Sequence, residues 1–239
     1  MITIDGLTVR FGGLIALNEI SASFTAPVAG IIGPNGAGKT TMMNVISGFA
    51  RATSGRISVN GRDFLSLPAH RRAHVGLRRS FQKEQIADDL SVFDNVRVQT
   101  DFRLFAGKSS ALEAARLLEF VGMSDKAQKM GARLTGFERR LTDVARCMMG
   151  QPSLIMFDEP AGGLSVEETK ILGDLILRIH AEIGAQVLII DHDVELISRV
   201  CVETLVLDFG RKIAFGPTAD VLADPKVKAA YLGTEEVEA

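Results

Sequence analysis

Cysteine is scarce in the 239-residue sequence, which contains only Cys147 and Cys201. Both lie in apolar surroundings, and neither belongs to a Cys-x-x-Cys motif or to a Cys/His pair at motif spacing. Nothing in this pattern indicates a disulfide framework. We therefore expect two reduced thiols inside the core, which fits a cytosolic setting.

Long apolar runs are absent as well. No stretch approaches the roughly 20 residues that a helix needs to span a bilayer. Met1 is not followed by the basic and apolar segments of a signal peptide. If the protein works at a membrane, another chain has to supply the spanning helices. The net charge of −2 gives no argument for nucleic acid or for an anionic membrane surface.

What the sequence does contain is the composition of a globular protein, 46% hydrophobic and 23% charged. Apolar and polar residues alternate over the first 30 residues, which predicts antiparallel β-structure. Further along, short apolar runs that we predict as buried strands alternate with helices, which indicates a largely parallel sheet. The strands are 29–32, 154–157 and 187–190, and the helices are about 39–47, 138–149 and 167–182.

Between these elements the character changes. From about residue 84 to 133 the apolar residues have helical spacing, and Ser91 is the predicted N-cap of a helix that begins at Val92. The prediction is an α/β body into which an all-helical segment is inserted.

One glycine-rich octapeptide fits the phosphate-binding motif G-x-x-x-x-G-K-[ST] completely, with a predicted strand before it and a helix after it. Glycines leave room for backbone N–H groups around a phosphate, and the helix directs its positive end at the same anion. We assign Lys39 to the β- and γ-phosphates of ATP, the Thr40 hydroxyl to Mg²⁺, and Thr41 to the nucleotide. The alternative is a glycine turn with an incidental lysine, but it does not account for the predicted strand before the motif and the helix after it. The residues of this P-loop are Gly33, Pro34, Asn35, Gly36, Ala37, Gly38, Lys39 and Thr40.

The predicted strand 154–157 ends in two carboxylates, Asp158 and Glu159. At a strand end near a P-loop, an aspartate holds Mg²⁺, usually through water. Glu159 would then face the γ-phosphate and orient or deprotonate the attacking water. An isolated Asp-Glu-Pro fits a turn equally well, but the P-loop upstream favours catalysis.

These two motifs, their separation and the helical block between them resemble the ATPase domain of ABC transporters over about residues 2–232. The resemblance implies ATP and Mg²⁺ as cofactors and the α/β fold of a P-loop NTPase in a single domain, 1–239. It places the RecA-like and antiparallel β parts at about 1–83 and 147–239, and the helical subdomain at about 84–146.

The resemblance also gives roles to three single residues. Phe11 matches the aromatic that stacks on adenine, with a core phenylalanine as the alternative. Gln82 matches a glutamine that touches Mg²⁺ and water and links the core to the helical segment; alone it would be a surface residue. His192 matches the histidine at the γ-phosphate; without the family it would be a histidine at a helix start.

The family signature LSGGQ corresponds here to Leu134, Thr135, Gly136, Phe137 and Glu138. Phe137 replaces a glycine whose backbone lies against a γ-phosphate, and Glu138 replaces a glutamine and adds negative charge near an anion. Both changes should weaken phosphate contact. Because the signature acts in trans in this family, the effect should fall on the partner's nucleotide. We therefore predict a heterodimer with unequal sites; a homodimer is the alternative.

Four strings look most like the importers of branched-chain amino acids and of urea or amides: 10–18, 32–41, 158–164 and 230–233. Such systems imply a second ATPase subunit, two membrane permease subunits and a periplasmic binding protein. The ATPase would be peripheral, on the cytoplasmic face of the membrane. Branched-chain amino acids are the favoured substrate. Urea or short-chain amides are the alternative, toward which residues 81–83 lean.

Two other function classes compete. A regulatory nucleotide-binding subunit with little hydrolysis would explain the altered signature, but Lys39, Asp158, Glu159 and His192 are intact.

A DNA-repair or translation-type ATPase would use the arginines at 71, 72, 78 and 79 on an anionic partner. No aromatic residues alternate with these arginines, and the net charge is acidic. We therefore expect the arginines to form ion pairs on the surface or inside the fold, and we expect no nucleic-acid partner.

Overall fold

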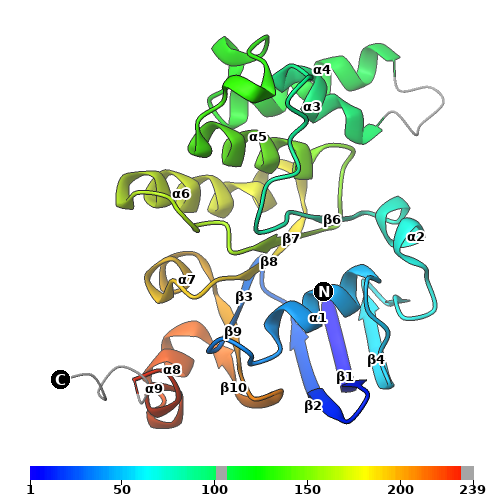
Figure 1. Ribbon diagram of the computed structural model, residues 1–239, viewed down its shortest axis with the longest axis vertical. Coiled ribbons are helices and arrows are strands. Elements are labelled where there is room, and N and C mark those ends of the chain that lie inside the picture. Colours follow the sequence, from blue (N-terminus) through cyan, green and yellow to red (C-terminus); the bar gives the residue numbers. More distant parts are fainter. Residues whose placement is uncertain (101–106, 233–239) are drawn as a thin grey trace.

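The structure is a computed structural model that describes residues 1–100 and 107–232. Two sheets form the body of the molecule, and a helical block lies at one end (Figure 1). This is the predicted α/β architecture with an inserted helical segment.

The first sheet is antiparallel, in the strand order β2-β1-β4-β5. Its strands are β1 (Ile2–Phe11), β2 (Leu14–Phe24), β4 (Ser54–Val59) and β5 (Arg62–Asp63). The predicted alternation over the first 30 residues is thus confirmed as an antiparallel hairpin, β1 against β2.

The second sheet has the order β10-β9-β3-β8-β7-β6 and is parallel except for β10. Its strands are β3 (Val28–Ile32), β6 (Leu77–Arg79), β7 (Leu154–Asp158), β8 (Gln186–Ile190), β9 (Glu203–Asp208) and β10 (Arg211–Pro217). Because parallel strands end at the same edge, the segments that follow β3, β7 and β8 meet there. That edge carries the P-loop, Asp158, Glu159 and His192.

Helices cover the parallel sheet and build the end block. They are α1 (Lys39–Ser47), α2 (Ala69–His74), α3 (Val92–Arg97), α4 (Gly107–Phe120), α5 (Gly136–Met148), α6 (Val166–Ile183), α7 (Val194–Val200), α8 (Thr218–Ala223) and α9 (Pro225–Leu232), with short 3₁₀ turns at Val98–Thr100, Ser124–Lys126 and Gly131–Arg133. Ser91 caps α3 as predicted, since its hydroxyl accepts a hydrogen bond from the Asp94 N–H. Among the described residues, no helix combines the length and apolar character that crossing a bilayer requires.

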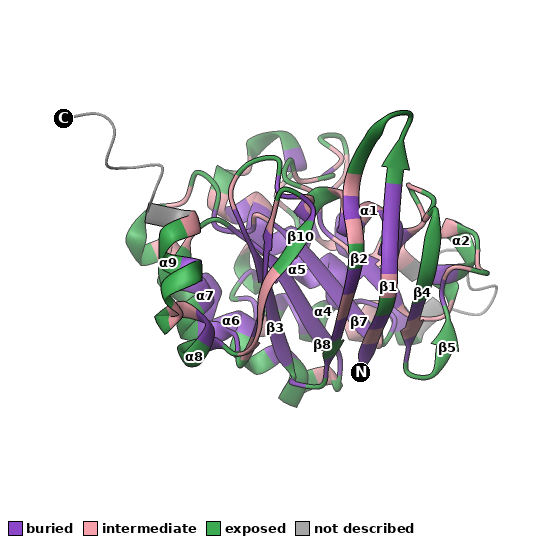
Figure 2. Cartoon of the chain, turned by 90° about the horizontal axis from the view of Figure 1, so that it is seen from below, coloured by how far each residue is buried: buried purple, intermediate pink, exposed green. Residues whose placement is uncertain are grey.

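The central strands are buried on both faces, so successive side chains enter two different cores (Figure 2). In β7, Ile155 and Phe157 pack with the helices α5 and α6, whereas Leu154 and Met156 pack with α1 and the antiparallel sheet. The parallel sheet therefore fixes the helical layer and the antiparallel layer at once. Cys147 and Cys201 are buried and unpaired, as predicted.

The C-terminal end of α1 is held by a buried arginine from α2. The Arg72 guanidinium, 4% exposed as a residue, donates from Nη1 to the carbonyls of Val45 and Ile46, and from Nε to the carbonyl of Leu67. These bonds satisfy carbonyls that a helix end leaves without partners. Arg72 is thus an internal residue of the fold, not part of a basic surface.

We predict that Arg72→Met lowers the free energy of unfolding by about 2 kcal/mol or more, because the substitution strands buried carbonyls while keeping the side chain's length. Denaturant unfolding of the full chain measures the change. Arg71→Met is the matched control, since Arg71 is exposed in the same helix. An equal loss of stability in both variants would contradict the capping role of Arg72.

Candidate nucleotide site

The P-loop connects β3 to α1 in a space that excludes side chains at two of its glycines. Gly33 has φ +153°, and a Cβ there would lie 2.1 Å from the Leu207 carbonyl oxygen. Gly38 has φ +102°, and a Cβ there would lie 2.7 Å from the Ala16 carbonyl oxygen. Both positions therefore require glycine. Gly38 is also the N-cap of α1 and supplies no side-chain cap, so the first turn of α1 keeps its N–H groups for a ligand.

Lys39 is folded back onto the loop that precedes it. Its Nζ donates to the carbonyl oxygens of Gly33 at 2.5 Å and Pro34 at 3.0 Å. Burial lowers the pKa of Lys39, an effect that the carboxylates of Glu159, Asp158 and Asp191 oppose. The ammonium is therefore held inside the loop among three carboxylates.

A cavity of about 480 Å³ opens along the P-loop. It brings the predicted P-loop residues 35–40, Thr41, Phe11 and Glu159 together. Leu14, Ile15 and Ala16 of the β1–β2 hairpin and the turn at Phe209-Gly210 complete its wall. Its lining thus combines the apolar side chains of Phe11, Leu14 and Ile15 with the charged side chains of Lys39 and Glu159, and a nucleotide needs both kinds of contact, for its base and for its phosphates.

Two aromatic side chains line the cavity. Phe11 is 52% exposed and lines the cavity, which contradicts the alternative of a core phenylalanine. Phe209 is 83% exposed and adopts φ +42°, a conformation that is unfavourable outside glycine. Phe209 was not identified from the sequence as part of this wall.

The acidic end of β7 is fixed by its neighbours. Glu159 has φ +47°, and its N–H donates to the Ile190 carbonyl at 2.7 Å. Backbone strain of this kind costs on the order of 1–3 kcal/mol and is concentrated at functional sites. The Gln82 Nε2 donates to Glu159 Oε2 at 2.7 Å, so Gln82 is not the unattached surface residue that it would be by itself. His192 Nδ1 lies 4.0 Å from the same Oε2 and 3.5 Å from Asp191 Oδ1, too far for strong hydrogen bonds.

Two site residues were not identified from the sequence. Arg79 pairs with the buried Asp158 carboxylate, Nη2 to Oδ2, at 2.8 Å. Asp191 is fully buried and accepts from the N–H groups of Ala161 and Asp193, so it joins the loop after β7 to the start of α7. Burial raises the pKa of Asp191, against the lowering effect of these hydrogen bonds. The only signal in the sequence was the position of each charge at a strand end.

The oxygen donors fit Mg²⁺. Thr40 offers a hydroxyl, Asp158 a carboxylate and Gln82 an amide oxygen, which are the hard ligands that Mg²⁺ takes. The described part of the chain holds no group of three or more His, Cys, Asp or Glu side chains arranged for a metal ion. That agrees with Mg²⁺, which uses one or two protein ligands together with phosphate oxygens and water.

The signature residues 134–138 lie at the start of α5, and the structure does not bring them into this cavity. The helix begins at Gly136, earlier than the predicted start near 138, because Thr135 and Glu138 form a capping box. Phe137 is half-buried against the core that α5 shares with α6. The side chain added in place of the family glycine thus packs partly inside the protein.

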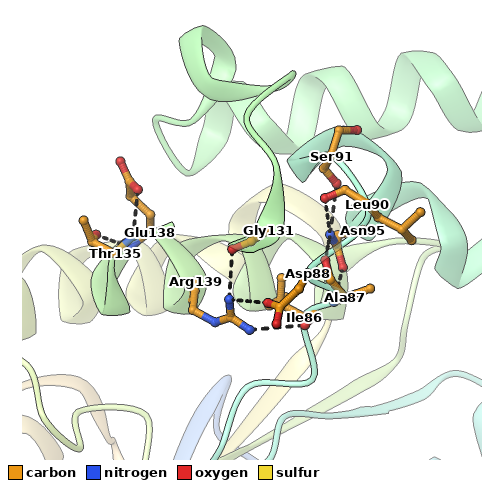
Figure 3. A network of polar contacts seen from close by, with 10 residues as sticks. All are labelled: Ile86, Ala87, Asp88, Leu90, Ser91, Asn95, Gly131, Thr135, Glu138 and Arg139. Carbon is orange, nitrogen blue, oxygen red and sulfur yellow. Dashed lines mark hydrogen bonds and ion pairs between the residues drawn. The ribbon is translucent and has the colours of Figure 1, made fainter. Parts of the chain in front are cut away.

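The Glu138 carboxylate is turned toward the start of its own helix, at Thr135 (Figure 3), and two lysines lie beside it. It accepts from the Thr135 N–H at 2.9 Å, from Lys129 Nζ at 2.6 Å and lies 3.2 Å from Lys126 Nζ. Desolvation would raise its pKa, but the hydrogen bonds of Lys129, Thr135 and Lys126 outweigh that effect and lower the pKa of Glu138 to about 2. The extra negative charge expected from the sequence is therefore largely compensated within the chain.

Arg139, the residue after Glu138, connects α5 to the segment that follows Gln82 through hydrogen bonds. Arg139 Nη1 donates to Asp88 Oδ1 and to the Gly131 carbonyl, both at 2.9 Å, and Nη2 donates to the Ile86 carbonyl at 3.2 Å (Figure 3). Beside it, the Arg140 guanidinium pairs with Glu84 at 2.9 Å. The helix that carries the signature is thus attached directly to the chain that leaves Gln82.

Comparisons with known proteins agree with this geometry. The family profile described as "ABC transporter" matches residues 17–162, and that described as "Branched-chain amino acid ATP-binding cassette transporter" matches residues 211–237. The high-affinity branched-chain amino acid transport ATP-binding protein LivG of Salmonella typhimurium is 34% identical over 249 residues, covering 98% of each chain. BraF of Pseudomonas aeruginosa, with the same description, is 34% identical at the same coverage.

Two solved structures share the whole fold. The ADP conformation of MJ1267, an ATP-binding cassette of an ABC transporter, superposes with a TM-score of 0.87 at 28% identity, over 98% of both chains. A nucleotide-free ATP-binding cassette from an ABC transporter has a TM-score of 0.86 at 27% identity, over 97% of this chain and 98% of that one. Sequence and fold therefore point to one group of proteins.

The low pKa of Glu138 predicts a pH-dependent contribution to stability. A carboxylate whose folded pKa lies below its unfolded value, about 4.3, stabilises the fold above that value and loses this effect as the pH falls toward 2. Wild type should therefore exceed Glu138→Gln in free energy of unfolding near pH 7, and the difference should shrink as the pH falls below about 4.5. Urea unfolding over this pH range measures it. Glu119→Gln, at an exposed position of α4, is the control; a Glu138 difference independent of pH would contradict the interpretation.

Proposed function

Because the chain belongs to the ATP-binding proteins of ABC transporters, we propose that it hydrolyses ATP to drive the import of branched-chain amino acids. The observation that carries this proposal is the single cavity that holds the P-loop, Phe11 and Glu159, with Gln82 bonded to Glu159. The substrate follows from the relatives LivG and BraF and from the family match at residues 211–237.

In the proposed reaction, water attacks the γ-phosphate of ATP and gives ADP and phosphate. Glu159 accepts the proton of the water, and its rigid backbone keeps the carboxylate at one place. Lys39 exchanges the carbonyls of Gly33 and Pro34 for phosphate oxygens, and the P-loop N–H groups stabilise the charge that develops. His192, exposed beside Glu159, would contact the γ-phosphate.

Thr40, Asp158 and Gln82 would hold Mg²⁺, which neutralises phosphate charge when it is bound. The chain's own contribution is to fix these oxygens. Thr40 lies in the first turn of α1, and Asp158 is held by Arg79.

The proposed partners are two membrane permease subunits and a second ATPase subunit, with a periplasmic binding protein that delivers the substrate. The chain would sit at the cytoplasmic face of the membrane as a peripheral subunit. The helical block between β6 and β7 would contact a permease, and the ties from Arg139 and Arg140 would connect it to Gln82.

The altered signature favours a second candidate, a regulatory subunit that binds nucleotide and hardly hydrolyses it. Phe137 stands where a glycine backbone is expected against phosphate. A urea or short-chain amide importer is the alternative transport substrate. Both alternatives are outcomes of the experiment below.

Reconstitution of the chain with its permeases and partner ATPase in vesicles tests the proposal. We expect leucine, isoleucine and valine uptake that requires ATP. We also expect Glu159→Gln to lower phosphate release by about 100-fold or more, since general base catalysis contributes about that much. ATP binding by Glu159→Gln is the control and should persist. A wild-type rate no faster than that of Glu159→Gln would establish the regulatory subunit instead, and uptake of urea in place of leucine would replace the proposed substrate.

The proposed pair of ATPases has unequal sites. The ATP held by Lys39 meets the partner's signature, whereas the partner's ATP meets Phe137 of this chain. We expect Lys39→Ala to abolish most of the turnover, and the equivalent lysine substitution in the partner to remove much less. Equal losses would contradict unequal sites. Phe137→Gly provides the matched test, because it should raise the share of turnover that depends on the partner's P-loop.

A further inference from the structure

We propose that Arg79 is a positioning residue for the Mg²⁺ site: it holds the Asp158 carboxylate and couples it to helix α1. The proposal rests on the Mg²⁺ role of Asp158 given above. It concerns a residue at the end of β6, outside the nucleotide cavity.

The Arg79 guanidinium is committed to three acceptors. Nη2 donates to Asp158 Oδ2 at 2.8 Å, and Nη1 donates to Asn44 Oδ1 at 2.7 Å and to Ser47 Oγ at 2.8 Å. The side chains of Arg79 and Asp158 are only 6% and 9% exposed. Asn44 and Ser47 belong to α1, the helix that begins at Lys39 and Thr40. One planar group thus joins the metal carboxylate to the P-loop helix.

Aromatic rings hold the guanidinium in this position. Its carbon lies 4.9 Å from the ring centre of Phe81 and 6.0 Å from that of Phe49. The next residue contacts Asp158 as well, because the Asp158 N–H donates to Ser80 Oγ at 3.2 Å. Arg79 and Ser80 therefore fix both the carboxylate and the backbone of Asp158.

A comparison with Arg72 separates this role from simple stabilisation. Arg72 also holds the C-terminal part of α1, but its hydrogen bonds go to the backbone carbonyls of Leu67, Val45 and Ile46. Arg79 meets a carboxylate that we assign to the metal. Outer partners of metal ligands orient them, and removing such a partner typically weakens metal binding by about 10–100-fold. Loss of a structural contact alone has no such selectivity for Mg²⁺.

The sign of the effect discriminates between two physical accounts. If the positive charge of Arg79 merely repelled Mg²⁺, removing it would strengthen Mg²⁺ binding. If Arg79 positions the carboxylate, removing it lets the side chain rotate away, and more Mg²⁺ is required. Our proposal requires the second result.

The experiment measures binding of the non-hydrolysable analogue adenylyl imidodiphosphate to the full chain by calorimetry, in EDTA and over a series of Mg²⁺ concentrations. We expect Arg79→Met to raise the Mg²⁺ concentration for half-maximal tightening by about tenfold, with little change in affinity in EDTA. Arg79→Lys keeps the charge but not the fork that reaches three acceptors, so it should fall between wild type and Arg79→Met. Arg72→Met is the matched control, with lower stability and an unchanged Mg²⁺ requirement.

An unchanged or lower Mg²⁺ requirement in Arg79→Met would overturn the proposal, and so would an equal shift in Arg72→Met. If Arg79→Met does not fold, Ser47→Ala serves instead, because it removes one hydrogen-bond partner of the guanidinium and leaves Asp158 in place. This variant should raise the Mg²⁺ requirement by a smaller amount. No shift would overturn the proposal. Wild type that binds the analogue equally with and without Mg²⁺ would instead disprove the metal site itself.

Discussion

The site depends on the backbone of Asp158 and Glu159 at the end of β7, because segments at the ends of both neighbouring strands, β8 and β6, are bonded to it. The Glu159 N–H is bonded to the end of β8, and the Asp158 N–H is bonded to Ser80 after β6. Parallel strands place these segments at one edge of the sheet. Two hydrophobic cores fix the position of β7, because alternate residues of this strand pack on opposite faces of the sheet. Packing on both faces therefore determines where the two carboxylates stand.

From this edge the contacts extend in one continuous path to the signature. Gln82 is bonded to Glu159, and the chain that follows it is tied to α5 through Arg139 and Arg140. A displacement of Gln82 would therefore act on α5, the helix whose first turn contains Phe137 and Glu138. The path consists of hydrogen bonds to carboxylates, joined by the chain from Gln82 to Asp88, and bonds to charged groups are stronger than those between neutral groups.

Much of the site could be predicted from the sequence because its signals are local. The P-loop helix was predicted at its observed bounds, Lys39–Ser47, and Ser91 was predicted as a cap, since both follow from residue types within a few positions. Arg79 and Phe209 could not be identified in this way. The role of each depends on a partner from a distant segment, β7 for Arg79 and the β1–β2 hairpin for Phe209. The pairing of β6 with β7 creates the first contact and the placement of the two sheets creates the second, and no local pattern encodes either.

In the signature segment a local pattern was present, but it was interpreted only as a phosphate contact and not as a helix cap. Thr135 and Glu138 form a capping box at the start of α5. In such a box a glutamate can accept the backbone hydrogen bond as well as the glutamine of the family signature can. Lys126 and Lys129 neutralise that carboxylate, so its charge is a weak argument for an impaired site. Phe137 is the stronger argument, because a half-buried side chain stands at a position where the family signature has a glycine. The proposed inequality between the two nucleotide sites thus rests on the shape of one residue more than on the charge of its neighbour.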